Sequence, residues 1–362
     1  MHCLVILRLQ LGSTRVIGLS LLAAATGSGQ FGYQNALHTM DYENSSYYGD
    51  FLLQSTSYHA GCFFGFIAFC FIGQLIGVRS GIRVGALLLE VTSLCSLAIV
   101  SDTARLAMIG WRFCFGISSG FFICFQTVLI DDISLDEYRL KMHALSGLAV
   151  PALYLAAVIL ASIEFLRSKM LLLPAAPSIS MAVISSPGAT VRAACIAIAI
   201  SVAAALAEPP LLMPFRNSVP IGEGILLKLV TVSSVISFLT HVLMLFIVNV
   251  VERRLLIVIS LAGLAACHFF FALLIHLQCG KAIYCTILLF TLVALYAVLY
   301  SIGLGIVCWS IALETAFGST ARLIQGAAHA CRALTTVLLI IFIRQYKLVS
   351  YSLYALLYIS KQ

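Results

Sequence analysis

The sequence predicts an all-α membrane protein with about twelve transmembrane helices in two similar six-helix halves. Three observations lead to this prediction. Of the 362 residues, 62% are hydrophobic and only 10% are charged, whereas soluble domains carry roughly 25% charged residues. The apolar runs are long and continuous, which favours helices over the alternating strands of a membrane barrel. Short charged motifs also recur at corresponding places in the two halves of the chain.

A transmembrane helix needs about 20 mostly apolar residues, and this length identifies the elements in order. The predicted spans lie near residues 16–35, 56–77, 84–100, 106–130, 142–163, 170–186, 193–214, 225–250, 255–276, 283–308, 324–343 and 348–360. The last run is short, so eleven spans followed by a re-entrant or truncated segment is an alternative. The first run could also be a signal peptide, although it continues without a clear cleavage site.

The topology follows from one sequon and a small charge bias. Asn44 begins the motif "NSS" in the loop after the first span, and a glycan at this asparagine requires the loop to face the lumen or the exterior. Lysine and arginine are slightly more frequent in the loops that would then face the cytoplasm. We therefore expect both ends of this multi-pass protein in the cytoplasm and the lipid bilayer as its surroundings.

Several functional classes are disfavoured by the composition. The net charge of +7 is spread over many short loops without a basic stripe, so no nucleic-acid partner is expected. The eight histidines show no pair at metal-ligand spacing, so we expect no metal and no cofactor. Most cysteines lie in apolar runs as small buried side chains. Only Cys279 and Cys285 flank a predicted outer loop, where they could form a disulfide.

Charged motifs give the two halves the same organisation. The basic link "VRSGIR" (78–83) follows the second predicted span, and "VERR" (251–254) follows the eighth. After the fourth span Asp132 precedes Arg139, and after the tenth Glu314 precedes Arg322. Repeated six-helix halves are typical of transporters that rock around a site near mid-membrane. Pairing between these charges would offset their desolvation at the cytoplasmic boundary, although each could also be an ordinary interfacial anchor.

Four stretches resemble one family in its own order along the chain. They are "GSGQFGYQNALH" (27–38), "WRFCFGISSG" (111–120), "NVVERRLLIVISLAGLAAC" (249–267) and "GLGIVCWSIALETAFGSTAR" (303–322). They resemble helix motifs of the sugar porter family within the major facilitator superfamily, with the facilitative glucose transporters as the closest branch. The resemblance implies two pseudo-symmetric bundles, residues 1–188 and 189–362, that carry a hexose or similar polyol by alternating access. It also implies an integral membrane protein, which we expect in the plasma membrane.

The resemblance assigns roles to individual residues. Trp309 stands where the family has a tryptophan that stacks on the sugar, and Gly116 and Gly120 match small residues that permit close helix contact. The implied cytoplasmic charge network consists of Arg79, Arg83, Asp132, Arg139, Glu252, Arg253, Arg254, Glu314 and Arg322.

The chain departs from the family at the sugar site. Gly147, Thr240 and Ser301 stand where the family has a glutamine, an asparagine and an acidic residue, and "CRALTT" (331–336) replaces an expected asparagine and tryptophan. The polar residues that remain within spans are the candidate solute ligands: Gln34, Gln126, Thr240, His241, Ser301 and Trp309. Each could instead make a helix-to-helix hydrogen bond. Glu90, on the third span, could serve as a proton relay or lie near the interface.

Three functions therefore compete. The first is a carrier for a sugar or similar small polar solute. The second is a relative that no longer transports and acts as a sensor or interaction protein. The third is a membrane enzyme, which would need a nucleophile with a base or clustered carboxylates and histidines. No two predicted helices offer such a set, so we expect a carrier and not an enzyme.

Overall fold

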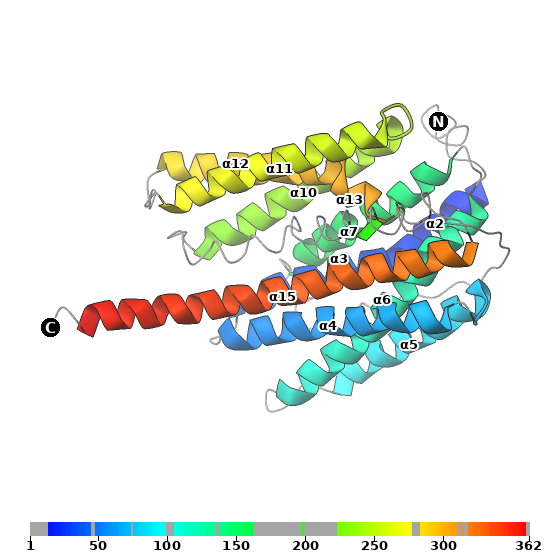
Figure 1. Cartoon of the computed structure of the whole chain (residues 1–362), viewed down its shortest axis with the longest axis horizontal. Coiled ribbons are helices and arrows are strands. Elements are labelled where there is room, and N and C mark those ends of the chain that lie inside the picture. The colour runs from blue at the N-terminus through cyan, green and yellow to red at the C-terminus, as the bar shows by residue number, and fades with distance from the viewer. Residues whose placement is uncertain are drawn as a thin grey trace.

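The computed structural model describes residues 14–44, 48–73, 75–98, 105–134, 138–161, 197–198, 201, 223–276, 283–309, 311, 313 and 318–359. Within these residues all the regular structure is helical, and Figure 1 shows the helices running side by side along one long axis. The predicted spans near 170–186 and 193–214 lie almost wholly outside the described residues, as does the predicted boundary at residue 188.

The described elements follow the predicted spans in order. They are α2 (Thr14–Thr26), α3 (Ser28–Asn44), α4 (Tyr48–Ile72), α5 (Val78–Ala98), α6 (Arg105–Ile133), α7 (Arg139–Ala161), α10 (Glu223–Ile247), α11 (Arg253–His276), α12 (Ile283–Ile302), α13 (Leu304–Val307) and α15 (Gly318–Ile359). The first and tenth predicted spans are each interrupted, at Gly27 and Gly303. Within the described ranges, parts of α4, α6, α7, α10 and α11 are long and apolar enough to cross a membrane.

The last two predicted spans form one continuous helix. α15 has 42 residues, which corresponds to about 63 Å at 1.5 Å per residue, roughly twice the hydrocarbon thickness of a bilayer. Residues 348–359 therefore extend α15 and do not form a separate span. The charges at Arg344 and Lys347 indicated a boundary, but no glycine or proline follows Gly326 to end the helix.

The helices pack as two groups that meet along two seams. In the N-terminal group α4 packs on α6, α6 on α5, and α3 on α7, while α10, α11 and α12 pack together in the C-terminal group. The groups meet where α7 contacts α10 and α13, and α15, from the C-terminal half of the chain, lies along α4 (Figure 1). Both seams join segments far apart in the sequence, so they position side chains from both groups around a common region.

Glycines allow α4 and α6 to approach closely. A Cβ atom added at Gly116 or Gly120 of α6 would collide with the carbonyl oxygens of Tyr58 and Cys62 on α4, and one added at Gly61 or Gly65 would collide with α6. Such spacing of small residues brings two helix backbones into contact in membranes. The close contact inferred for Gly116 and Gly120 is present in the structure.

Candidate functional site

Trp309 lies at the junction of the two helix groups. It follows α13, and its side chain is buried with 3% exposure. Its ring centroid is 6.4 Å from that of Phe31 on α3 and 5.3 Å from that of His329 on α15. Phe31 belongs to the N-terminal group and the other two residues to the C-terminal half of the chain, so this contact spans the junction.

Arg332 on α15 brings a positive charge to the same place. Its guanidinium carbon lies 4.9 Å from the Trp309 ring centroid and 5.4 Å from that of Phe31. Nη1 donates to Cys308 Sγ over 3.3 Å and Nη2 donates to Tyr300 Oη over 3.4 Å. A desolvated cation over an aromatic face gains about 2 kcal/mol, so the rings stabilise this buried charge.

Gln325 and His329 form the polar side of α15 at this point. Gln325 Nε2 donates to the Trp309 carbonyl over 3.0 Å and to His329 Nε2 over 2.6 Å. Because His329 Nε2 accepts a hydrogen bond, its proton resides on Nδ1 and the ring is neutral. Gln325 also lies 3.5 Å from Thr127 Oγ1 on α6, which ties α15 to the N-terminal group.

His59 on α4 completes the arrangement. Its ring lies 5.6 Å from that of Phe31, and its side chain is 4% exposed. The charge of Arg332 acts on this imidazole as well as on that of His329. Within the described part of the chain, His59 Nδ1 has no hydrogen-bond partner. We use the name central cluster for the six residues Phe31, His59, Trp309, Gln325, His329 and Arg332.

Of the predicted solute ligands besides Trp309, Gln34 lies nearest to the central cluster along the chain. It stands three residues after Phe31 and therefore on a similar face of α3. Its Oε1 accepts a hydrogen bond from Arg112 Nη1 over 3.3 Å, and both side chains are buried. This bond joins α3 to α6, the helix-to-helix role that was the alternative for each candidate.

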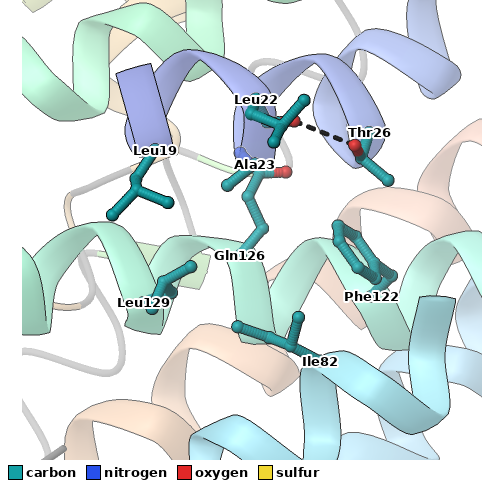
Figure 2. A pocket seen from close by; sticks show the side chains of 8 residues that line it. All are labelled: Leu19, Leu22, Ala23, Thr26, Ile82, Phe122, Gln126 and Leu129. Carbon is teal, nitrogen blue, oxygen red and sulfur yellow. Dashed lines mark hydrogen bonds between the residues drawn. The ribbon is translucent and has the colours of Figure 1, made fainter. Parts of the chain in front are cut away.

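Gln126 on α6 uses its amide to hold three helices together. Its Oε1 accepts from the Ser28 backbone N–H over 2.7 Å, and its Nε2 donates to Ser28 Oγ and to Ser146 Oγ. Figure 2 shows Gln126 beneath α2 in a small pocket that Ile82, Phe122 and Leu129 also line. The pocket volume is about 10 Å³, the space of a single water molecule and far too little for a sugar.

Thr240 and Ser301 make hydrogen bonds within the C-terminal group. Thr240 Oγ1 donates to the Ile236 carbonyl of its own helix, and Ser301 Oγ lies 2.8 Å from Ser237 Oγ. His241 Nδ1 donates to the Ser237 carbonyl over 2.8 Å. Gly147 faces Gly305, where an added Cβ would lie 2.8 Å from the carbonyl oxygen. No glutamine fits there without moving α7 away from α13.

A second polar group lies where α6 ends and α7 begins. Arg139 Nε is 3.2 Å from Asp131 Oδ1, and His143 Nε2 is 3.3 Å from the same oxygen. Asp131 is therefore the direct contact of Arg139, while the Asp132 carboxylate experiences the charges of both Arg322 and Arg139. The sequence motif identified the right helix end, but the neighbouring carboxylate makes the close pair.

The other predicted charges are distributed along the helix ends. The side chains of Arg79, Arg83, Glu252 and Arg254 are exposed, and Arg253 is half-buried. Glu314 lies outside the described residues, as do Cys279 and the side chain of Cys285. Asn44 is the last residue of α3, and its side chain is also outside the described part. Among the described residues no three His, Cys, Asp or Glu side chains gather to hold a metal.

The three residues that α15 contributes to the central cluster were not among the predicted site residues, although their spacing in the sequence indicates a shared helix face. Gln325, His329 and Arg332 follow the spacing i, i+4, i+7 in an otherwise apolar run, which places them on one face of a helix. Ionisable residues within a membrane helix usually face the protein interior and mark functional positions. His59 and Phe31 had no comparable signal, because only the packing of α3 and α4 brings them to this face.

Comparisons with known proteins agree on one architecture. The family described as "Sugar (and other) transporter" matches residues 23–184 and 218–359. A comparison with curated proteins gives no significant match.

Among solved structures, the chain is similar to the MFS (major facilitator superfamily) proton:xylose symporter XylE bound to 6-bromo-6-deoxy-D-glucose, with 15% identity, a TM-score of 0.73 and coverage of 93% of this chain and 90% of that chain. It is similar to the inward-open xylose transporter XylE from E. coli, with 14% identity, a TM-score of 0.63 and coverage of 91% and 95%. It is also similar to the human organic anion transporter MFSD10, with 12% identity, a TM-score of 0.62 and coverage of 89% and 91%. At these identities the likeness shows the major facilitator fold.

Proposed function

The chain belongs to the sugar (and other) transporter family and is a multi-pass membrane carrier, and we propose that its solute binds at the central cluster. The observation that carries this proposal is that residues from both halves of the chain form the cluster. Phe31 and His59 come from α3 and α4, whereas Trp309 and Arg332 come from the C-terminal half. When two halves rock around a site between them, the site opens to one side of the membrane at a time.

Trp309 is the proposed platform for the solute. An indole face can cover the apolar side of a sugar ring without any partner for the hydroxyl groups. The amide and acidic groups that the family resemblance leads us to expect are absent at Gly147, Thr240 and Ser301. Each lost hydrogen bond is worth about 0.5–1.5 kcal/mol, so three would lower hexose affinity by about 10-fold to 2,000-fold. We therefore propose that common hexoses bind weakly and that the solute carries fewer hydroxyl groups.

The charged helix ends are the proposed cytoplasmic gate. Asp131, Arg139 and His143 form one contact at the end of α6, and Arg322 of α15 acts on the adjacent Asp132. The interaction of Arg322 with Asp132 joins the two halves, and it can close the inner side while the outer side is open. We propose that this face lies in the cytoplasm, with both chain ends there, and that the protein resides in the plasma membrane with Asn44 glycosylated outside.

Uptake into vesicles tests the proposed function. The purified chain is reconstituted into liposomes, and uptake of radiolabelled hexoses, deoxyhexoses and acidic sugars is measured against liposomes without protein. We expect saturable uptake of at least one member of this panel, with glucose among the poorer ones. Absence of protein-dependent uptake for the whole panel would contradict the proposal and favour a relative that no longer transports.

A further inference from the structure

His59 brings to the central cluster a ring nitrogen that can bind a solute. Its side chain is 4% exposed, and Nδ1 has no hydrogen-bond partner among the described residues. The polar side chains that α15 contributes bond to other residues of the C-terminal half. Gln325 donates to the Trp309 carbonyl and to His329, and Arg332 donates to a cysteine and a tyrosine.

The ring contacts of His59 account for an aromatic residue at this position but not for an imidazole. The ring centroid lies 5.6 Å from that of Phe31 and 5.4 Å from that of Tyr58, with both pairs close to edge-to-face. A phenylalanine would make these contacts equally well. Leaving a buried polar nitrogen without a partner is unfavourable, and buried polar groups in native proteins usually have one. The imidazole therefore points to a ligand that supplies the missing hydrogen bond.

Phe31 places His59 within reach of a solute on Trp309. Its ring contacts both side chains, with centroids 5.6 Å from that of His59 and 6.4 Å from that of Trp309. Because a hydroxyl group both donates and accepts, it can bond to Nδ1 in either tautomer of the imidazole. His59 belongs to the N-terminal group and Trp309 to the C-terminal half. A solute that contacts both therefore favours the arrangement in which the two halves are close together.

We propose that His59 is a specificity-determining residue, which binds one hydroxyl group of a sugar-like solute of hexose size. The apolar face of the solute lies on Trp309, and the hydroxyl group bonds to His59 Nδ1. This proposal rests on the proposed function in using the same site, and it adds one selective contact from the N-terminal group. The contact does not depend on the positions at which the chain lacks the expected amides.

Glucose and its monodeoxy derivatives test the proposal, because each derivative lacks one hydroxyl group. Dissociation constants are measured on the purified full chain in detergent by ligand-detected NMR, which suits weak binding. In the native chain at least one derivative should bind about 2-fold to 13-fold more weakly than glucose, the range for one hydrogen bond. In His59→Phe this ratio should fall to about 1. His59→Asn, which keeps a polar atom near the position of Nδ1, should retain part of it.

His268→Phe is the matched control, because it makes the same change at an exposed histidine of α11 that contacts Tyr296 outside the central cluster. It should leave every ratio unchanged. A purely structural role of His59 would weaken the binding of glucose and of all derivatives equally, and this result would overturn the proposal. Equal binding of glucose and all its derivatives by the native chain, or no binding of glucose, overturns it even if His59→Phe fails to fold.

Vesicle uptake distinguishes the failure of this proposal from the failure of the proposed function. Uptake of a panel member, combined with ratios that do not change in His59→Phe, would leave transport in place and overturn the contact with His59. A ratio that depends on His59 in a chain without uptake would contradict the transport function and leave the contact in place.

Discussion

Trp309 shows how one side chain can connect the two halves of this carrier. Its ring meets Phe31 from α3, while its carbonyl accepts a hydrogen bond from Gln325 on α15. Arg332 lies over the same ring. The motif around residue 309 allowed the tryptophan to be singled out from sequence, and the structure shows which neighbours surround it.

Replacing this indole should weaken solute binding more than it weakens the fold. Trp309→Ala is expected to lower affinity for the transported solute by about 2-fold to 13-fold, because stacking on the aromatic platform contributes about 0.5–1.5 kcal/mol. Trp309→Phe should recover part of this loss. Binding is measured by calorimetry with the best solute of the uptake panel.

The second tryptophan provides the control for this change. Trp111 is also buried, and its indole nitrogen donates to the Thr92 carbonyl, away from the central cluster. Trp111→Ala should cost stability without changing the affinity of the protein that remains folded. Equal affinity for the native chain and Trp309→Ala would show that the solute binds elsewhere.

Polar residues could be found from sequence, but their partners could not. Gln126, Thr240 and Ser301 were correctly recognised as polar positions within apolar runs, yet each makes a hydrogen bond to Ser28, Ile236 or Ser237. Which way a side chain points depends on the rotation of its helix, and packing against distant elements sets that rotation. Whether these residues also contact the solute during transport stays a prediction.

At the level of elements, the contact between α4 and α6 depends on glycines, which have no side chain to keep the two helices apart. Gly61 and Gly65 of α4 face Gly116 and Gly120 of α6, and a Cβ at any of the four would meet backbone atoms of the other helix. The family resemblance indicated Gly116 and Gly120 as small residues that permit close helix contact, but it did not indicate α4 as their partner. The continuity of α15 was harder to predict, because Arg344 and Lys347 within this helix resemble a loop between two spans.

Two alanine substitutions on the same helix test the role of this contact. Gly116→Ala places a methyl group against the Tyr58 carbonyl, whereas nothing lies within 4 Å of a Cβ at Gly110. Gly116→Ala should therefore destabilise the protein by about 1–3 kcal/mol, and Gly110→Ala should stabilise α6 by up to about 1 kcal/mol. Thermal unfolding in detergent measures both. Similar melting temperatures for the two variants would show that α4 and α6 are not held this closely.

At the scale of the whole molecule, composition and repetition were enough to predict the fold class. Long apolar runs and matched charges after corresponding spans indicated two similar halves, and the major facilitator fold confirms that architecture. The seams between the halves could not be predicted, because the contacts of α15 with α4 and of α13 with α7 join residues more than 100 positions apart. These seams contain the central cluster, so the site was less predictable than the fold.

Alternating access requires the seam between α4 and α15 to open and close, and a crosslink across it tests this central claim. A Cβ at Gly326 would lie 2.5 Å from Cys70 Sγ, so Gly326→Cys can form a disulfide with Cys70 after a small shift. Vesicle uptake of the best solute is measured for this variant under oxidant and after reductant, with Gly326→Ser and the native chain as controls. We predict that oxidation abolishes uptake in Gly326→Cys alone and that reductant restores it; undiminished uptake with the crosslink fully formed would contradict transport by movement of the two halves.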